Sequence, residues 1–161
     1  MNMRWKPNVT VAAVIERQQD GVSRFLLVEE HTPQGLMLNN PAGHLDAGES
    51  MVAACAREVL EETAHEFRPT ALVGIYMARV RRGAGHDVTY LRFAFCGDLG
   101  RFDPARRLDH GIVRTLWLTA DEIRANTQRH RSPMLLRGID DYLRMQRYPL
   151  DLLHTDSSVS G

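Results

Sequence analysis

A segment without proline, from Ser50 to about Ala64, restricts the possible folds of this chain more than any other. It is rich in helix-forming residues, and serine is a favoured residue just before a helix begins. On a helical wheel the side chains of Glu58, Glu61 and Glu62 share one arc of about 100°. Ala54 lies on the same acidic arc. The separate arc that would pack on a sheet holds Val52, Cys55, Ala56, Val59, Leu60 and Thr63. The segment is therefore predicted to be a helix that packs its apolar arc on a sheet and directs three carboxylates elsewhere.

The residues around this helix alternate between strand and turn patterns. Runs of β-branched and aromatic residues separated by glycine-bearing turns predict two strand pairs. The first joins residues 8–16 to 24–30, and the second joins 70–80 to 88–99. Further strands are predicted at residues 36–38 and 112–118, and helices at 119–126, with Thr119 as the cap, and at 132–146, with Pro133 in the first turn. This order predicts an α/β protein in which a mixed sheet lies between the central helix and the C-terminal helix.

The composition is that of one domain without a strong overall charge. The chain has 161 residues, of which 43% are hydrophobic, and this is enough for a single buried core. Because 20 Lys and Arg residues balance 20 Asp and Glu residues, neither nucleic acid nor a membrane surface is expected as a partner. Residues 1–154 are predicted to form the domain and residues 155–161 a flexible tail. No segment has the pattern of a membrane span or a signal peptide, so a cytoplasmic location is expected.

Two interpretations of the acidic arc are open from the residues alone. Glu58 and Glu62 repel each other at i,i+4 spacing, which costs an isolated helix about 0.2–0.5 kcal/mol. In the first interpretation the arc is a solvated face on which Arg57 pairs with Glu61. In the second, the carboxylates are hard oxygen ligands for Mg²⁺ or a similar ion. The loop with Pro41 and Gly43 directly before the helix favours the second interpretation.

The charged residues of this region follow a known spacing. Glycine, five residues, glutamate, seven residues and then the sequence REVLEE resembles the signature of the Nudix hydrolases, written G-x5-E-x7-R-E-U-x-E-E-x-G-U with U a bulky aliphatic residue. The matching residues are Gly43, Glu49, Arg57, Glu58, Glu61 and Glu62. Ala64 and His65 depart from it, standing where the family has glycine and an aliphatic residue. Because that glycine serves as a left-handed helix cap, its loss is expected to alter the helix end and to leave the ligands intact.

The resemblance extends beyond the signature to nearly the whole chain. The segments NVTVAAVI, FLLVEE, NNPAGHLDAGES, LRFAF, RSP and QRYPL are similar to those of one phosphatase branch of the family. Leu38 stands where that branch has tryptophan before its asparagine. The resemblance implies an α/β/α sandwich of the Nudix type, with the signature helix against a mixed sheet.

The resemblance also implies a site and a reaction. The metal ligands would be Glu58, Glu61, Glu62 and the backbone carbonyl of Ala42, with Mg²⁺ as the ion and Mn²⁺ as a substitute. Arg57 would pair with Glu49 and hold the loop against the helix. Glu61 and Glu58 are both candidates for the general base. A later loop often adds an acid, but Gly111 stands at that offset. Whether Asp109 or His110 contributes is therefore open.

The implied substrate is a small nucleotide or organic diphosphate, including the diphosphate of a thiamine precursor, cut at its P–O–P linkage by water. Candidate substrate-binding residues are Arg79, Arg92 and His86, near or within the loop between two long strands, and Asn39. The arginines are alternatively simple solvated side chains. Alternative functions are hydrolysis of nucleoside-diphosphate sugars or dinucleoside polyphosphates, or nucleotide binding without catalysis. The protein is expected to be a monomer or a homodimer.

Overall fold

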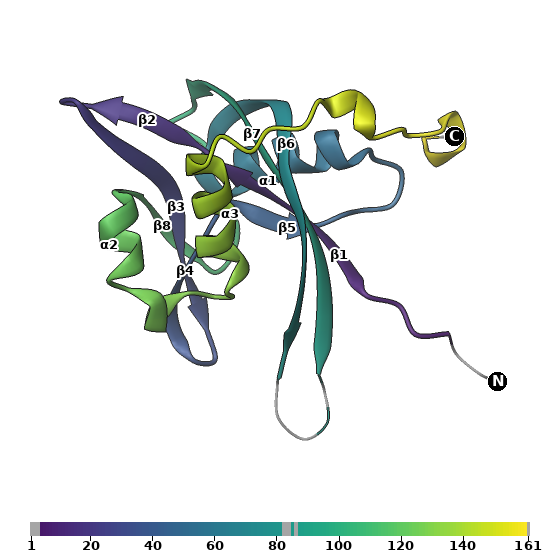
Figure 1. The fold of residues 1–161 in the computed structure, drawn as a ribbon, viewed down its shortest axis with the longest axis horizontal. Coiled ribbons are helices and arrows are strands. Elements are labelled where there is room, and N and C mark those ends of the chain that lie inside the picture. The colour runs from purple at the N-terminus through teal and green to yellow at the C-terminus, as the bar shows by residue number, and fades with distance from the viewer. Residues whose placement is uncertain (1–3, 82–84, 86, 161) are drawn as a thin grey trace.

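In the part of the chain that the structure describes, two four-stranded sheets and three α-helices make up the fold (Figure 1). The structure is a computed structural model that describes residues 4–81, 85 and 87–160. The strands are β1 (Asn8–Val14), β2 (Glu16–Gln19), β3 (Val22–Thr32), β4 (Gly35–Asn39), β5 (Ala42–His44), β6 (His65–Val80), β7 (Val88–Phe102) and β8 (Ile112–Leu118). The helices are α1 (Met51–Thr63), α2 (Ala120–Arg124) and α3 (Met134–Leu143), with short 3-10 turns η1 (Thr127–Arg129), η2 (Leu150–Leu152) and η3 (Ser157–Val159).

The first sheet has the strand order β5-β1-β7-β6 and is mixed, as predicted, because β1 runs parallel to β7 and antiparallel to β5. The second sheet is antiparallel and was not predicted as a separate sheet. In it β3 pairs with β2, β4 and β8. The predicted pairing of residues 8–16 with 24–30 is therefore wrong for most of its length. The chain changes sheets at Ile15, and only the four residues of β2 form the hairpin with β3.

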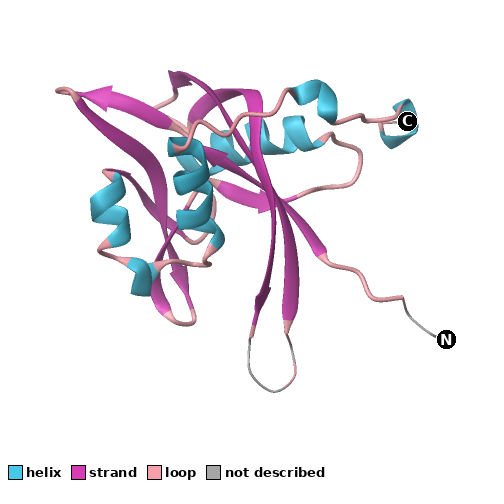
Figure 2. Cartoon of the chain, in the orientation of Figure 1, coloured by secondary structure: helices cyan, strands magenta, loops and turns pink. Residues whose placement is uncertain are grey.

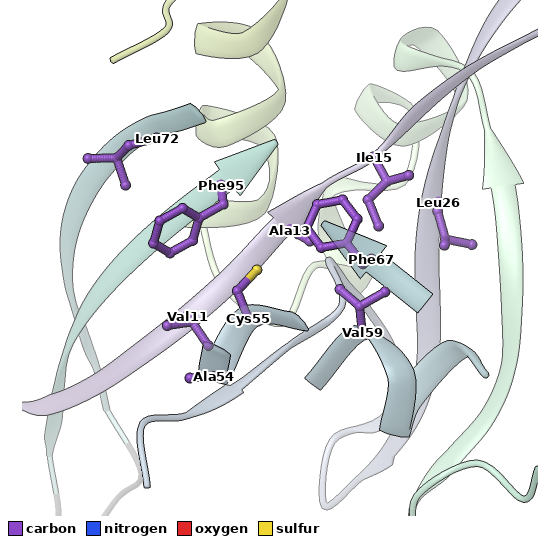
Figure 3. Close-up of a cluster of buried hydrophobic side chains, with 10 residues drawn as sticks. All are labelled: Val11, Ala13, Ile15, Leu26, Ala54, Cys55, Val59, Phe67, Leu72 and Phe95. Carbon is purple, nitrogen blue, oxygen red and sulfur yellow. The ribbon is translucent and has the colours of Figure 1, made fainter. Parts of the chain in front are cut away.

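The mixed sheet lies between α1 and α3 (Figure 2). Alternation along β1 explains this, since successive side chains of a strand point to opposite faces. Val11 and Ala13 pack in the cluster that contains Cys55 and Val59 of α1 (Figure 3). Val14 instead packs with residues of α2, α3 and the second sheet. Both faces of β1 are buried, so it sits in the middle of the sandwich.

Capping residues set both ends of α1. The Ser50 hydroxyl accepts a hydrogen bond from the backbone N–H of Ala53 at 3.1 Å, as an N-cap does. At the other end Ala64 adopts the left-handed conformation, with φ of 58°, and its N–H donates to the carbonyl of Leu60. The expectation that the missing glycine would alter the helix end is therefore wrong. Alanine takes the same conformation at a steric cost of about 1 kcal/mol.

His65 belongs to the exit from the helix and not to the acidic arc. It is the first residue of β6, and its ring Nδ1 lies 3.0 Å from the carbonyl oxygen of Thr63. Its ring also packs against Phe102, with 4.8 Å between the ring centres. His65 therefore has a structural role at the exit from the helix.

The C-terminal residues follow the mixed sheet and then extend past α1 (Figure 1). Tyr148 forms an isolated bridge with Leu72 of β6, and Leu150 and Leu153 pack on the core cluster beneath α1. The segment predicted as a flexible tail contains the turn η3, and its mobility stays a prediction. None of the helices in the described part of the chain is long and apolar enough to cross a membrane.

Candidate active site

The loop before α1 brings the backbone close to the acidic arc. β5 pairs with β1, with Gly43 opposite Val11, so the loop backbone is anchored to the centre of the sheet. A Cβ atom on Gly43 would lie 2.0 Å from the carboxylate carbon of Glu58 and 2.0 Å from its Oε1. Only glycine leaves room for this carboxylate. This contact gives a physical reason for the first position of the signature.

Arg57 connects the loop to the carboxylates of the helix. Its Nε and Nη2 donate to the two carboxylate oxygens of Glu49 at 3.0 and 2.7 Å, and Nη2 also donates to the carbonyl of His44 at 3.0 Å. Its Nη1 donates to Glu58 at 2.8 Å and to Glu61 at 2.9 Å. The pairing with Glu49 that the resemblance implied and the i,i+4 pairing with Glu61 are both present. These hydrogen bonds, above all that to Glu49, raise the pKa of Arg57.

Two of the three carboxylates are removed from water. Glu58 and Glu62 are 8% and 9% exposed. Burial raises the pKa of Glu58, although Arg57 opposes the shift, and burial raises the pKa of Glu62 to about 8. Glu62 is held by the backbone N–H of Ala42, which donates to its Oε2 at 2.9 Å. A carboxyl group whose pKa is raised by burial is less readily ionised. A cation bound beside it would stabilise the ionised form.

The carboxylates of Glu58, Glu61 and Glu62 are the kind of ligand that a hard divalent cation takes, but in this structure they do not converge on one point. Glu58 and Glu61 converge on the single nitrogen Nη1 of Arg57, whereas Glu62 faces Ala42. Within residues 4–81, 85 and 87–160, no three His, Cys, Asp or Glu side chains converge as a bound metal ion requires. Buried carboxylate oxygens with too little positive charge around them are nevertheless the ligands that Mg²⁺ prefers. The three carboxylates would fit such an ion if Glu62 gave up its hydrogen bond from the backbone N–H of Ala42 and bound the ion instead.

Asp109 joins the acidic region from a loop after β7. Its backbone N–H donates to the carbonyl oxygen of Glu61 at 3.0 Å, at the C-terminal end of α1. Its negative charge contributes to the raised pKa of both Glu58 and Glu62. Of the two residues left open by the sequence, Asp109 therefore lies within electrostatic reach of the acids. His110 is exposed.

A buried polar cluster adjoins the acids on the other side. Arg92 of β7 is 5% exposed, and burial lowers its pKa to about 10. Its Nη2 donates to Asn39 Oδ1 over a long 3.4 Å, while its Nε and Nη1 have no hydrogen-bond partner in the described part of the protein. The negative charges of Glu30 and Glu62 act on it. Two predicted substrate-binding residues thus meet beside the acidic arc.

Glu30 and Thr10 of this cluster were missed by the sequence analysis. The Oε1 atom of Glu30 and the hydroxyl of Thr10 are buried without a hydrogen-bond partner among the described residues. Burial raises the pKa of Glu30. A signal for Glu30 existed in FLLVEE, where acidic residues directly follow a buried apolar run. Nothing in the local sequence marked Thr10.

One of the remaining two predicted residues, Arg79, is not part of the acidic region. Arg79 is paired with Asp87 at 2.5 Å, and its side chain is 65% exposed. It lines a cavity of about 690 Å³ between the end of β6 and the start of α3. His86 lies outside the residues that the structure describes.

Comparison with known proteins agrees with the signature and the fold. The NUDIX domain family matches residues 6–137, which is most of the chain. The chain belongs to the Nudix hydrolase family. Phosphatase NudJ of Escherichia coli strain K12 is 36% identical over 150 residues, covering 92% of each protein. Hydrolysis of pyrophosphate linkages, the reaction of the family, therefore applies to this Nudix enzyme.

Solved structures of Nudix proteins resemble this one. A NUDIX hydrolase from Nitrosomonas europaea is 52% identical, with a TM-score of 0.85 over 94% of this chain and 98% of that one. A MutT NUDIX hydrolase from Burkholderia pseudomallei is 18% identical, with a TM-score of 0.67 over 85% of this chain and 98% of that one, and it shows the shared fold alone. The α/β/α sandwich of the Nudix type is confirmed.

Proposed function

We propose that this Nudix enzyme cuts the P–O–P linkage of a nucleoside di- or triphosphate, or of a related small organic diphosphate, by attack of water on phosphorus. The proposal includes dependence on Mg²⁺, with Mn²⁺ able to replace it. The observation that carries it is that the carboxylates of Glu58 and Glu61 both bind Nη1 of Arg57. The loop before α1 approaches the Glu58 carboxylate so closely that only glycine fits at position 43. The diphosphate of a thiamine precursor, which the family resemblance implied, stays among the candidate substrates.

In this proposal the carboxylates of Glu58, Glu61 and Glu62 hold the ion together with the carbonyl oxygen of Ala42. A bound Mg²⁺ compensates the charge of phosphate oxygens and lowers the pKa of water. Arg57 acts as a positioning residue, since its fork of hydrogen bonds to Glu49 fixes the loop while Nη1 fixes two of the acids. Asp109 adds negative charge from the neighbouring loop.

The general base is one of two acids in this proposal. The side chain of Glu61 is 27% exposed and that of Glu58 is 11% exposed. A base must reach a water molecule within about 3 Å. Glu61 is therefore the better placed candidate, and Glu58 is the alternative.

Arg92 and Asn39 would bind the phosphates beside the acids. Among the described residues, the Nε and Nη1 atoms of the buried Arg92 have no hydrogen-bond partner, and phosphate oxygens that reach these nitrogens would satisfy them. Arginine suits such recognition because its planar fork matches phosphate oxygens. The low dielectric constant around the buried guanidinium of Arg92 would strengthen its attraction to the phosphate.

A panel of diphosphates tests this proposal. Nucleoside di- and triphosphates, a thiamine-precursor diphosphate, a nucleoside-diphosphate sugar and a dinucleoside polyphosphate are incubated with Mg²⁺, with Mn²⁺ or with a chelator. Phosphate and pyrophosphate release are scored separately, so the panel also decides between the alternative substrates. Glu61→Gln should lower turnover at least about 100-fold. Glu66→Gln is the matched control, because Glu66 is an exposed glutamate that pairs with Arg101.

The outcomes are distinct. Turnover that a chelator leaves intact contradicts the dependence on a divalent ion. Binding of a nucleotide without turnover of any diphosphate supports the non-catalytic alternative. Equal turnover in Glu61→Gln and Glu66→Gln contradicts the assignment of the acidic arc. The cytoplasmic location and the monomeric or homodimeric state stay predictions.

A further inference from the structure

A cavity of about 690 Å³ lies between the end of β6 and the segment that leads into α3. Its volume is in the range of pockets that bind small molecules, about 300–1,000 Å³. Four of the eleven side chains that line it are arginines, and one is an acid. The arginines among them are Arg79, Arg81, Arg131 and Arg137.

Nearby acids neutralise only part of this charge. Asp140, the acid in the lining, already accepts a hydrogen bond from Arg124 at 2.7 Å. Arg137 shares its partner Asp141 with Arg144, so one carboxylate serves two arginines. The cavity therefore has an excess of positive charge.

Two arginines carry most of that excess. Among the residues that the structure describes, no carboxylate lies within ion-pair distance of Arg81. Arg131 has only a long contact, 3.4 Å from its Nε to Oε1 of Glu30. Burial lowers the pKa of His130, which disfavours a positive charge on its imidazole. Among the described residues, a bound anion would therefore meet one arginine that is weakly paired and one that is unpaired.

The cavity adjoins the buried polar cluster beside the acidic arc. Arg131 lines the cavity, and its backbone N–H donates to the carbonyl of Leu38 at 2.9 Å, which places it next to Asn39. Its side chain faces Glu30, on which the charge of Arg92 also acts. One continuous series of polar groups thus leads from Arg92 to the cavity.

We propose that this cavity is a second anion subsite, which binds a phosphate monoester at the end of the substrate remote from the P–O–P linkage. The inference rests on the proposed function and narrows it to organic diphosphates that carry a further phosphate. A nucleoside diphosphate with an additional 2′- or 3′-phosphate has this chemistry. Arg81 and Arg131 are the specificity-determining residues of the subsite.

Calorimetry with two ligands that contain no P–O–P linkage tests the subsite apart from catalysis. Adenosine 3′,5′-bisphosphate and AMP are titrated into the protein with Mg²⁺ at fixed ionic strength. The bisphosphate should bind at least about tenfold more tightly than AMP, and added salt should reduce this ratio. The ratio should fall at least about threefold in Arg81→Gln. Arg68→Gln is the matched control, because Arg68 is an exposed arginine that pairs with Asp98 at 2.5 Å.

Two results would overturn the subsite. One is equal affinity of the wild-type protein for both ligands, or no binding of the bisphosphate. The other is an unchanged ratio in both Arg81→Gln and Arg131→Gln. Since neither ligand is hydrolysed, loss of the binding preference is separable from failure of the proposed function. If the proposed function failed but the subsite existed, the protein would still prefer the bisphosphate to AMP and would turn over no diphosphate.

Discussion

Substituting Gly43 by alanine should damage the site while leaving the fold intact. The added Cβ would lie 2.0 Å from the carboxylate of Glu58, whereas ordinary contacts begin at 3.4 Å. The carboxylate must therefore move by about 1.4 Å, the difference between these distances. Because the obstacle is the far end of a flexible side chain, the free energy of unfolding should fall by only about 1 kcal/mol. A misplacement of about 1 Å in a catalytic group costs on the order of 100-fold in rate, or about 2.7 kcal/mol.

The assay combines activity and stability. The value of kcat/KM on the best substrate of the panel is measured beside urea unfolding monitored by circular dichroism. Gly138→Ala is the control, because its Cβ would meet Val14 at an ordinary 3.7 Å and α3 should gain about 0.5–1 kcal/mol from losing an interior glycine. Retention of more than half the activity in Gly43→Ala would refute the argument that Glu58 is held in place by this contact. Loss of activity with a loss of 4 kcal/mol or more, on the order of a core defect, would equally refute it.

Further expectations concern charge and stability. Glu62, with a pKa raised from 4.5 to about 8, holds its proton more tightly in the folded state than in the unfolded state. Without divalent ions, the free energy of unfolding should therefore fall between about pH 5 and pH 8, by on the order of 3 kcal/mol. Urea titrations across this range should show the decline in the wild type and a flatter profile in Glu62→Gln. Arg57→Lys keeps the charge but loses the two-pronged bond to Glu49, so kcat/KM should fall by about 10–100-fold; wild-type kinetics in this variant would contradict the positioning role. Asp141 is 1% exposed and accepts hydrogen bonds from three side chains, so Asp141→Asn should lower the free energy of unfolding by about 3 kcal/mol. Thermal unfolding should show a loss below about 1 kcal/mol for the control Asp140→Asn.

The helices and most strands could be predicted because their signals are local. The caps at Ser50 and Thr119 are both present, as short-range patterns indicated. The error in the first strand pair has a different origin. Residues 8–16 read as one strand, but the chain breaks at Ile15, so that residues 8–14 and 16–19 lie in different sheets. Which sheet a strand joins depends on its pairing partners. The partner that holds β1 in the mixed sheet is β7, which is far away in sequence, whereas β2 pairs with its neighbour β3 in the other sheet.

The same distinction applies to the apolar arc of α1. Cys55 and Val59 are buried as the wheel predicted, but Ala56 and Leu60 from the same arc are only half-buried. Ala54, which lies on the acidic arc, is fully buried. The wheel gives directions around the helix axis, whereas burial depends on which elements surround it. In this protein the sheet covers one side and the Gly43 loop part of another.

The sequence by itself determined that Glu58, Glu61 and Glu62 share one arc of a capped helix, because the helical period and the cap are local properties of the chain. Only the tertiary structure decided that two of these acids are buried and one has a pKa of about 8. It also decided that Arg92 lies beside them. These properties arise from the loss of water and from contacts between segments that are distant in the chain, and no local pattern of residues specifies either one.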